Sequence, residues 1–338
     1  MTSVRAARRI AITAAFGGGG LGLLTLGAVG LLVVEERLAR RVVGEPAGEP
    51  PRADGIYGEG PGEPISLVAI GDSSAAGLGV LDPHETPGAL VAAGLSSFAE
   101  RPVRLTVAAR SGAQSTDLAR QVEEALAEAP DVALIMIGAN DVTHRMRPSQ
   151  SVRLLDHAVR RLRGQGCEVV VGTCPDLGTI EPVPQPLRYL ARRWSRQLGA
   201  AQTIAVVEAG GRTVSLGDLL GPEFYARPRM MFGPDRFHPS TEGYASAAMA
   251  LLPTMCAALG LWPDEDELPD AFRGEGVLPV AFAAVEAVEE AGTEVAATQV
   301  GGRDRGPRGR WALLRHRRRQ PLPDVEAGGA LHEPRGRR

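Results

Sequence analysis

Five short apolar runs recur along the chain with longer helical patterns between them, and this alternation restricts the fold more than any other feature. The runs cover Ile65–Ile70, Val103–Ala108, Val132–Ile137, Glu168–Gly172 and Thr203–Val207. Strands that are buried on both faces have nearly continuous apolar sequences, and strands that alternate with helices form parallel sheets. The sequence therefore predicts an α/β fold in which helices cover both faces of a parallel sheet.

The predicted domain lies between segments of different composition. With 44% hydrophobic and 23% charged residues, the whole chain has the composition of one large globular domain with appendages. We expect the following parts: a basic stub over 1–9, an apolar span over 10–34, a Gly-, Pro- and Glu-rich linker over 35–64, the folded domain over 65–262, an extension with one helix over 263–302, and a disordered Arg-rich tail over 303–338.

Residues 10–34 carry no charge and predict a membrane anchor. As a helix with a rise of about 1.5 Å per residue, this run spans roughly 37 Å, enough to cross a bilayer with some tilt. The competing interpretation is a cleaved signal peptide, but its apolar region is usually only about 7–15 residues long. The numbers of arginines on the two sides of the span are equal, so they do not decide which side of the membrane the domain occupies. The short basic stub favours a single-pass anchor with an extracytoplasmic domain.

Charge and cysteine content exclude other classes of function. The net charge of −3 gives the whole chain no nucleic-acid footprint. The Arg-rich tail is compatible with contact to an anionic lipid or polymer, and equally with a solvated tail that has no partner. Three cysteines do not form a disulfide framework, and Cys167 and Cys174 bracket one predicted strand, so we expect buried thiols. No cysteine or histidine spacing indicates a metal site.

A serine directly follows the first predicted strand, in the sequence Gly71-Asp72-Ser73. In open α/β sheets, ligands bind at the carboxyl ends of the strands, although Gly-Asp-Ser is also an ordinary turn sequence. A serine nucleophile needs a base, and His238 is the best candidate because Asp235 precedes it by three residues. That spacing lets the carboxylate hold the Nδ1 proton of the imidazole. The other histidines have no comparable setting.

Donors for an oxyanion also follow predicted strands. Asn140 follows the third strand and offers a side-chain amide, and Gly112 follows the second and lets a backbone N–H approach the substrate. The backbone N–H of Ser73 is a third candidate donor. Taken alone, Asn140 and Gly112 are also ordinary turn residues.

Together these blocks resemble the SGNH, or GDSL-type, hydrolase family. The matching blocks, in order, are Gly71-Asp72-Ser73, Ser111-Gly112, Gly138-Ala139-Asn140-Asp141 and Asp235-Arg236-Phe237-His238. The resemblance covers about residues 65–261. It implies a flavodoxin-like three-layer α/β/α fold with a five-stranded parallel sheet, and ester hydrolysis without a cofactor. One departure is Ser74, where the family name expects leucine.

Carried over by position, the resemblance implies Ser73 as nucleophile, His238 as base and then acid, and Asp235 as its orienting partner. It also implies Gly112, Asn140 and the Ser73 N–H as the oxyanion hole. The expected function is a serine ester hydrolase that uses water to cleave a lipid or a small carboxylic ester. A carbohydrate O-acetyl esterase acting on cell-surface polysaccharide fits as well. A non-catalytic binding module is the alternative from another class, and the presence of Ser73, Asn140 and His238 argues against it.

The remaining expectation concerns the border of the site. Residues 175–178 and 182–186 follow the fourth predicted strand, so we expect both segments to lie near the site.

Overall fold

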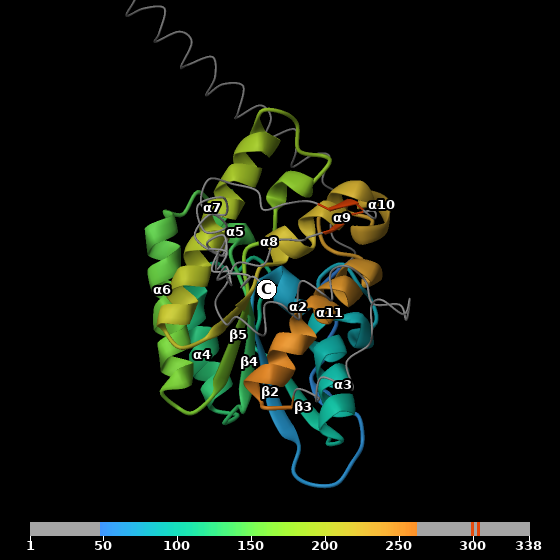
Figure 1. The fold of residues 1–338 in the computed structure, drawn as a ribbon, viewed down its shortest axis with the longest axis vertical. Helices are drawn as coiled ribbons and strands as arrows, with labels where there is room; N and C mark the ends of the chain where they lie inside the picture. Colours follow the sequence, from blue (N-terminus) through green and yellow to red (C-terminus); the bar gives the residue numbers. More distant parts are fainter. Residues whose placement is uncertain (1–47, 262–298, 301–302, 305–338) are drawn as a thin grey trace, which may run out of the picture.

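The computed structural model describes residues 48–261, 299–300 and 303–304 (Figure 1). The predicted membrane span at 10–34 and most of the C-terminal extension and Arg-rich tail lie outside the described residues. Within the described part, no helix combines the length and the hydropathy needed to cross a bilayer. At the start of the tail, β8 (Arg303–Asp304) pairs antiparallel with β7 (Gln299–Val300).

The domain is built on a six-stranded mixed sheet with the order β1-β3-β2-β4-β5-β6. The strands are β1 (Gly55–Tyr57), β2 (Ile65–Gly71), β3 (Val103–Val107), β4 (Val132–Met136), β5 (Glu168–Gly172) and β6 (Arg212–Val214). The strands β2 to β6 are parallel to their neighbours, whereas β1 pairs antiparallel with β3. The predicted parallel sheet is present, with one additional antiparallel edge strand.

Alternate residues of the strands point to opposite faces of the sheet, and each face has its own core. In β2, Leu67 and Ala69 belong to one buried cluster, while Val68 and Ile70 belong to the other. This period of two explains why the strands read as continuous apolar runs, since both faces are buried.

Helices cover both faces of the sheet (Figure 1). The longer ones are α3 (Pro87–Ala99), α4 (Leu118–Leu126), α6 (Pro148–Arg163), α7 (Leu187–Glu208) and α11 (Thr241–Ala258). Figure 1 shows α3 and α11 on one side of the sheet and α4, α6 and α7 on the other. The short helices are α2 (Ser73–Ala76), α5 (Ala139–Thr143), α8 (Leu216–Leu219), α9 (Gly221–Ala226) and α10 (Pro228–Met231).

The prediction of a strand over Thr203–Val207 is wrong, because these residues form the last turns of α7. Their β-branched side chains favour strand by local preference. The helix nevertheless buries Thr203 and Val206 at helical spacing, while Ile204 is 52% exposed and Val207 is 36% exposed. Packing of the long amphipathic helix overrides the local preference. The fifth parallel strand is β6, which is only three residues long.

The predicted linker also contains part of the sheet. Within residues 35–64, Gly55–Tyr57 form β1, and the Asp54 carboxylate accepts a hydrogen bond from the Val107 N–H beyond the end of the pairing. Tyr57 donates its hydroxyl to the Ala53 carbonyl at 2.7 Å. The sheet therefore begins ten residues before Ile65.

The three cysteines are buried and free, as predicted. Burial raises the pKa of Cys167 and of Cys256 to about 12, and it raises the pKa of Cys174 well above its usual value. All three therefore remain neutral thiols at physiological pH.

The strand order places a binding position at the carboxyl end of β2. Counting only the parallel strands, the order is that of flavodoxin-like doubly wound sheets, in which the chain crosses from one side of the first strand to the other. Such sheets bind ligands at this switch point. Ser73 follows β2, and Asn140 follows the neighbouring strand β4.

Candidate active site

Ser73 begins α2 directly after a sharp turn from β2. The turn requires Gly71, whose φ is +141° and where a Cβ atom would lie 1.8 Å from the Met136 carbonyl oxygen. The buried Gln121 side chain accepts from the Gly71 N–H at 2.8 Å and donates to the Gly71 carbonyl at 3.0 Å. Asp72 caps α2 by accepting from the Ser74 N–H. The end of β2 is thus held in position immediately before the serine.

His238 lies on a loop whose two ends pair with each other. Phe232 and Pro239 form an antiparallel bridge, and the Gly233 N–H donates to the His238 carbonyl at 2.8 Å. Between these ends, Arg236 takes a left-handed conformation with φ of +59°. Asp235 is buried, whereas Arg236 is exposed, so the tight turn directs these neighbouring side chains differently. We call residues 232–239 the acid–base loop.

The structure brings Ser73, His238 and Asp235 into one hydrogen-bonded chain. The Nε2 atom of His238 lies 3.1 Å from the Ser73 Oγ, and its Nδ1 atom lies 2.6 Å from the Asp235 Oδ2. The other oxygen of Asp235 accepts the N–H groups of Phe237 and His238 at 2.9 and 3.0 Å. Burial raises the pKa of Asp235, but these hydrogen bonds outweigh it, so the pKa lies below its usual value. Asp235 is therefore an ionised acceptor for the imidazole N–H.

The predicted oxyanion donors have different surroundings. Asn140 lines the pocket beside Ser73, and its Nδ2 donates to the Ala113 carbonyl at 3.1 Å, which leaves one of its two amide hydrogens for a ligand. The Ser73 N–H, at the first position of α2, has no acceptor among the described residues. Gly112 lies in an exposed turn with φ of +78° and is not among the residues that line the pocket.

Asp141 joins the turns that carry Gly112 and Asn140, a role that the sequence analysis did not assign. Its buried carboxylate accepts the Ser115 N–H at 2.9 Å and the hydroxyls of Ser115 and Ser151 at 2.5 and 2.6 Å. Ser115 follows Gly112 by three residues, so this network ties the loop after β3 to α5. The one sequence signal for this role is the position of Asp141 as the last residue of the Gly-Ala-Asn-Asp block.

Gln121 and Gln202 are two further site residues that the sequence analysis missed. Gln202 accepts from the Cys174 N–H at 2.8 Å and donates to the Ile137 carbonyl at 3.0 Å, which links the ends of β5 and β4. Both side chains are fully buried on the core-facing sides of α4 and α7, which are mostly apolar. A glutamine in the apolar stripe of an amphipathic helix is the signal that could have identified them.

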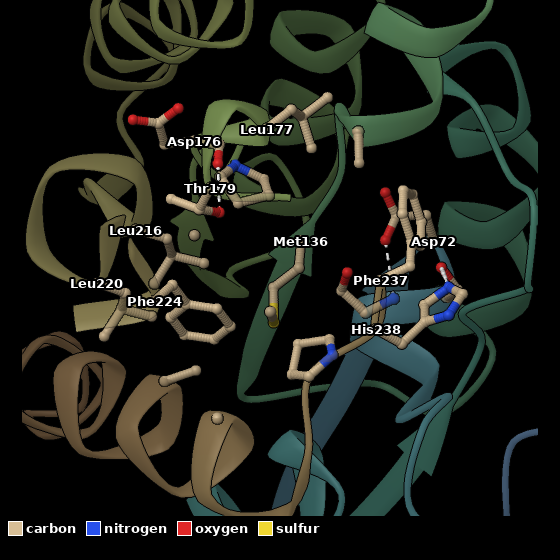
Figure 2. A pocket seen from close by; sticks show the side chains of 18 of the residues that line it. Asp72, Met136, Asp176, Leu177, Thr179, Leu216, Leu220, Phe224, Phe237 and His238 are labelled. Atoms are coloured by element: carbon tan, nitrogen blue, oxygen red, sulfur yellow. Dashed lines mark hydrogen bonds between the residues drawn. The ribbon is translucent and has the colours of Figure 1, made fainter. Parts of the chain in front are cut away.

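An apolar pocket of about 90 Å³ extends from Ser73 and His238 into the domain. Figure 2 shows Met136 between His238 and Phe237 on one side and Leu216, Leu220 and Phe224 on the other. Pro175, Asp176 and Leu177 also line it, which confirms the prediction for residues 175–178. Residues 182–186 are not among its lining residues, so that part of the prediction is wrong.

Asp72, beside the serine, is a buried carboxyl group in a different setting. Burial raises its pKa from the usual value to about 6, because the backbone and side-chain hydrogen bonds from Ser74 and the electrostatic effect of His238 compensate only part of the lost hydration. Among residues 48–261, no group of three or more His, Cys, Asp or Glu side chains is arranged to hold a metal ion.

The sequence is similar to those of known proteins. The model of the GDSL-like lipase/acylhydrolase family matches residues 69–246. A GDSL-like esterase of Mycobacterium tuberculosis is 44% identical over 250 residues, which are 70% of this chain and 80% of that protein.

Two solved structures are more distant. An alpha/beta hydrolase enzyme from the metagenome of Lake Arreo is 24% identical with a TM-score of 0.46, over 62% of this chain and 100% of that chain. A variant of an acetyl xylan esterase from Geobacillus stearothermophilus is 21% identical with a TM-score of 0.46, over 61% and 98%. These likenesses are too weak to bear on substrate. The family model and the mycobacterial relative show that this chain is an ester-bond hydrolase and belongs to the GDSL-like lipase/acylhydrolase family.

Proposed function

We propose that the enzyme cleaves esters by a Ser-His-Asp mechanism with an acyl-enzyme intermediate. The observation that carries this proposal is the hydrogen-bonded chain from Ser73 through His238 to Asp235 at the mouth of an apolar pocket. The distance of 3.1 Å from Nε2 to Oγ is within reach for general-base catalysis. The ionised Asp235 fixes the Nδ1–H tautomer, so Nε2 is free to accept the serine proton.

In the first half-reaction, the Ser73 Oγ attacks the ester carbonyl carbon while His238 takes the hydroxyl proton. The negative charge that develops on the carbonyl oxygen is stabilised by the Ser73 N–H and the free amide hydrogen of Asn140. The bond from carbon to the alcohol oxygen then breaks, and His238 gives its proton to that oxygen.

In the second half-reaction, water replaces the alcohol. His238 takes a proton from the water as the water oxygen attacks the acyl carbon. The bond to the Ser73 Oγ breaks, the carboxylic acid leaves, and the proton returns to Oγ. Atoms and charge balance over the cycle, with one ester and one water giving one acid and one alcohol.

The lining of the pocket favours a hydrophobic acyl group. Leu216, Leu220, Phe224 and Met136 would all contact an acyl chain bound to Ser73 (Figure 2). Each CH₂ that is buried contributes about 0.8 kcal/mol to the free energy of binding. A short acyl chain therefore gains several-fold in affinity over acetate for each CH₂ that it adds. A lipid or a small carboxylic ester with an apolar acyl group therefore fits this pocket better than an O-acetyl sugar.

Hydrolysis of p-nitrophenyl esters from acetate to palmitate tests both parts of the proposal. We expect kcat/KM to rise from acetate to a short apolar chain, and a fluorophosphonate probe to label Ser73. A sharp preference for acetate would instead favour the carbohydrate O-acetyl esterase. Absence of both turnover and labelling would contradict the mechanism.

We also propose that residues 10–34 anchor the enzyme in a membrane with the domain on the extracytoplasmic side. The support is the uncharged length of this run. The full-length protein should stay in the membrane fraction after carbonate and high-salt washing, whereas attachment through the Arg-rich tail would be salt-sensitive. A chain that begins at residue 48, and so keeps β1, should move to the supernatant. Protection of the domain from protease added to intact cells would reverse the sidedness.

A further inference from the structure

Another hollow lies beside the acid–base loop and shares Phe232 with the apolar pocket. Its lining residues are Glu181, Pro228, Arg229, Phe232, Gly233, Pro234 and Arg236. The volume of about 330 Å³ exceeds many times the roughly 15 Å³ that one water needs, so a polar group of a substrate fits.

Among the residues that the structure describes, the lining of the hollow carries more positive than negative charge. The Arg236 Nη2 lies 3.4 Å from the Glu181 Oε2. Both side chains are about half exposed, at 53% and 52%, so this ion pair is weak. The side chain of Arg229 makes no hydrogen bond or ion pair in the part of the chain that the structure describes. Two guanidinium groups therefore face one loosely held carboxylate.

The backbone fixes one of these arginines relative to His238. The left-handed conformation of Arg236 is held by its N–H, which donates to the Gly233 carbonyl at 2.9 Å, and by the Gly233 N–H bond to the His238 carbonyl. The same short loop thus presents His238 to Ser73 and Arg236 to the hollow. A group bound at Arg236 is held by the same loop as the base.

We propose that this hollow binds an anionic group, a phosphate or a carboxylate, on the alcohol part of the ester. The inference rests on the proposed function, in which the acyl group fills the apolar pocket and His238 protonates the departing alcohol. The alcohol must then lie outside that pocket, and the hollow adjoins it at the loop that carries His238. Guanidinium groups bind phosphate and carboxylate through paired hydrogen bonds, which gives the preference for an anion.

The test compares two esters with the same acyl group and similar leaving groups, 1-butyrylglycerol and 1-butyrylglycerol 3-phosphate. For the full-length enzyme we expect kcat/KM to be larger for the phosphate ester. Arg229→Gln should lower the ratio of the two kcat/KM values about tenfold, which corresponds to about 1.4 kcal/mol. Glu181→Gln should raise the ratio, because it removes the opposing carboxylate. Arg153→Gln, at an exposed arginine on α6, is the matched control and should leave the ratio at the wild-type value.

Equal ratios in the wild type, Arg229→Gln and Arg153→Gln would overturn the inference while leaving ester hydrolysis intact. Loss of turnover of both esters, without labelling of Ser73, would instead count against the proposed mechanism. In that case, binding of glycerol 3-phosphate measured by calorimetry still decides the inference. We expect glycerol 3-phosphate, but not glycerol, to bind and Arg229→Gln to weaken that binding, and no detectable binding would overturn it.

Discussion

The site has two halves, the strand-end half with Ser73 and Asn140 and the acid–base loop with Asp235 and His238. They are held in place by different means. Ser73 and Asn140 follow parallel strands, and buried side chains fix the ends of those strands: Gln121 holds Gly71, and Gln202 holds Ile137. The acid–base loop follows no strand and is closed by its own bridge from Phe232 to Pro239. The sheet therefore positions the nucleophile, while a self-contained turn positions its base.

The two halves also differ in the direction in which they shift the pKa of a buried aspartate. In the strand-end half, Asp72 has one backbone donor, and burial raises its pKa to about 6. In the acid–base loop, Asp235 has two backbone donors and the imidazole, and its pKa lies below the usual value. The comparison shows that the depth of burial and the donors facing a carboxylate together decide which form it takes.

The largest expected effect comes from the strand-end half. Ser73→Ala should reduce kcat by a factor on the order of 10⁶, because the acyl-enzyme cannot form. The neighbouring variant Ser74→Ala is the control and should lose far less, because it leaves the Ser73 nucleophile in place. Turnover of a p-nitrophenyl ester measures both. If Ser73→Ala kept a tenth of the wild-type activity, the serine would have no place in the mechanism.

The corresponding change in the acid–base loop is Asp235→Asn. It should lower kcat by roughly 10⁴, because an amide favours the wrong tautomer of His238. Asp72→Asn removes a buried carboxylate of the same size beside Ser73 and is the matched control, with a much smaller loss expected. Equal losses of kcat in the two variants would contradict the assignment of Asp235, and not Asp72, as the partner of His238.

Asn140→Ala tests the strand-end half without touching the Ser73–His238 contact. We expect kcat to fall by roughly 10²–10³ while KM changes little, because the lost donor acts mainly on the charge of the transition state. Asn140→Asp should be worse, since it places a carboxylate near that charge. A loss confined to KM would assign Asn140 to substrate binding alone.

The smallest effect concerns stability and pH. The folded-state pKa of Asp72 is raised, so its contribution is intact below about pH 4 and is lost as the pH rises to about 6. Asp72→Asn should therefore increase the free energy of unfolding at pH 8 by up to about 3 kcal/mol and change it little near pH 4. Urea denaturation at the two pH values measures this difference.

Asp235→Asn should act in the opposite direction in the same urea experiment. The pKa of Asp235 is lowered, so its stabilisation is present at neutral pH and is lost only as the pH falls through the acidic range. The variant should therefore be less stable than the wild type at pH 8. Stabilisation by both substitutions would show that burial and donors do not separate the two aspartates.

Local sequence accounted for much of the fold. Thr86 stands directly before Pro87 at the start of α3, and its Oγ1 caps the helix by accepting from the Ala89 N–H. The run Thr203–Val207 was wrongly predicted to be a strand, because its β-branched residues favour a strand by local preference. Contacts with the sheet determine the helical conformation of α7 as a whole. β1 was missed because three residues at an edge carry no periodic pattern, and they form a strand only by pairing with β3.

The sequence by itself determined the alternation of strands and helices, the serine at the end of β2 and the pairing of Asp235 with His238, because each depends on residues within a few positions of one another. Only the tertiary structure brought His238 to Ser73 across 165 residues, gave Asp72 and Asp235 opposite pKa shifts, and set the arginine-lined hollow beside the acid–base loop. Those features depend on burial by the folded chain and on the approach of segments that are far apart in the sequence, which no local pattern encodes.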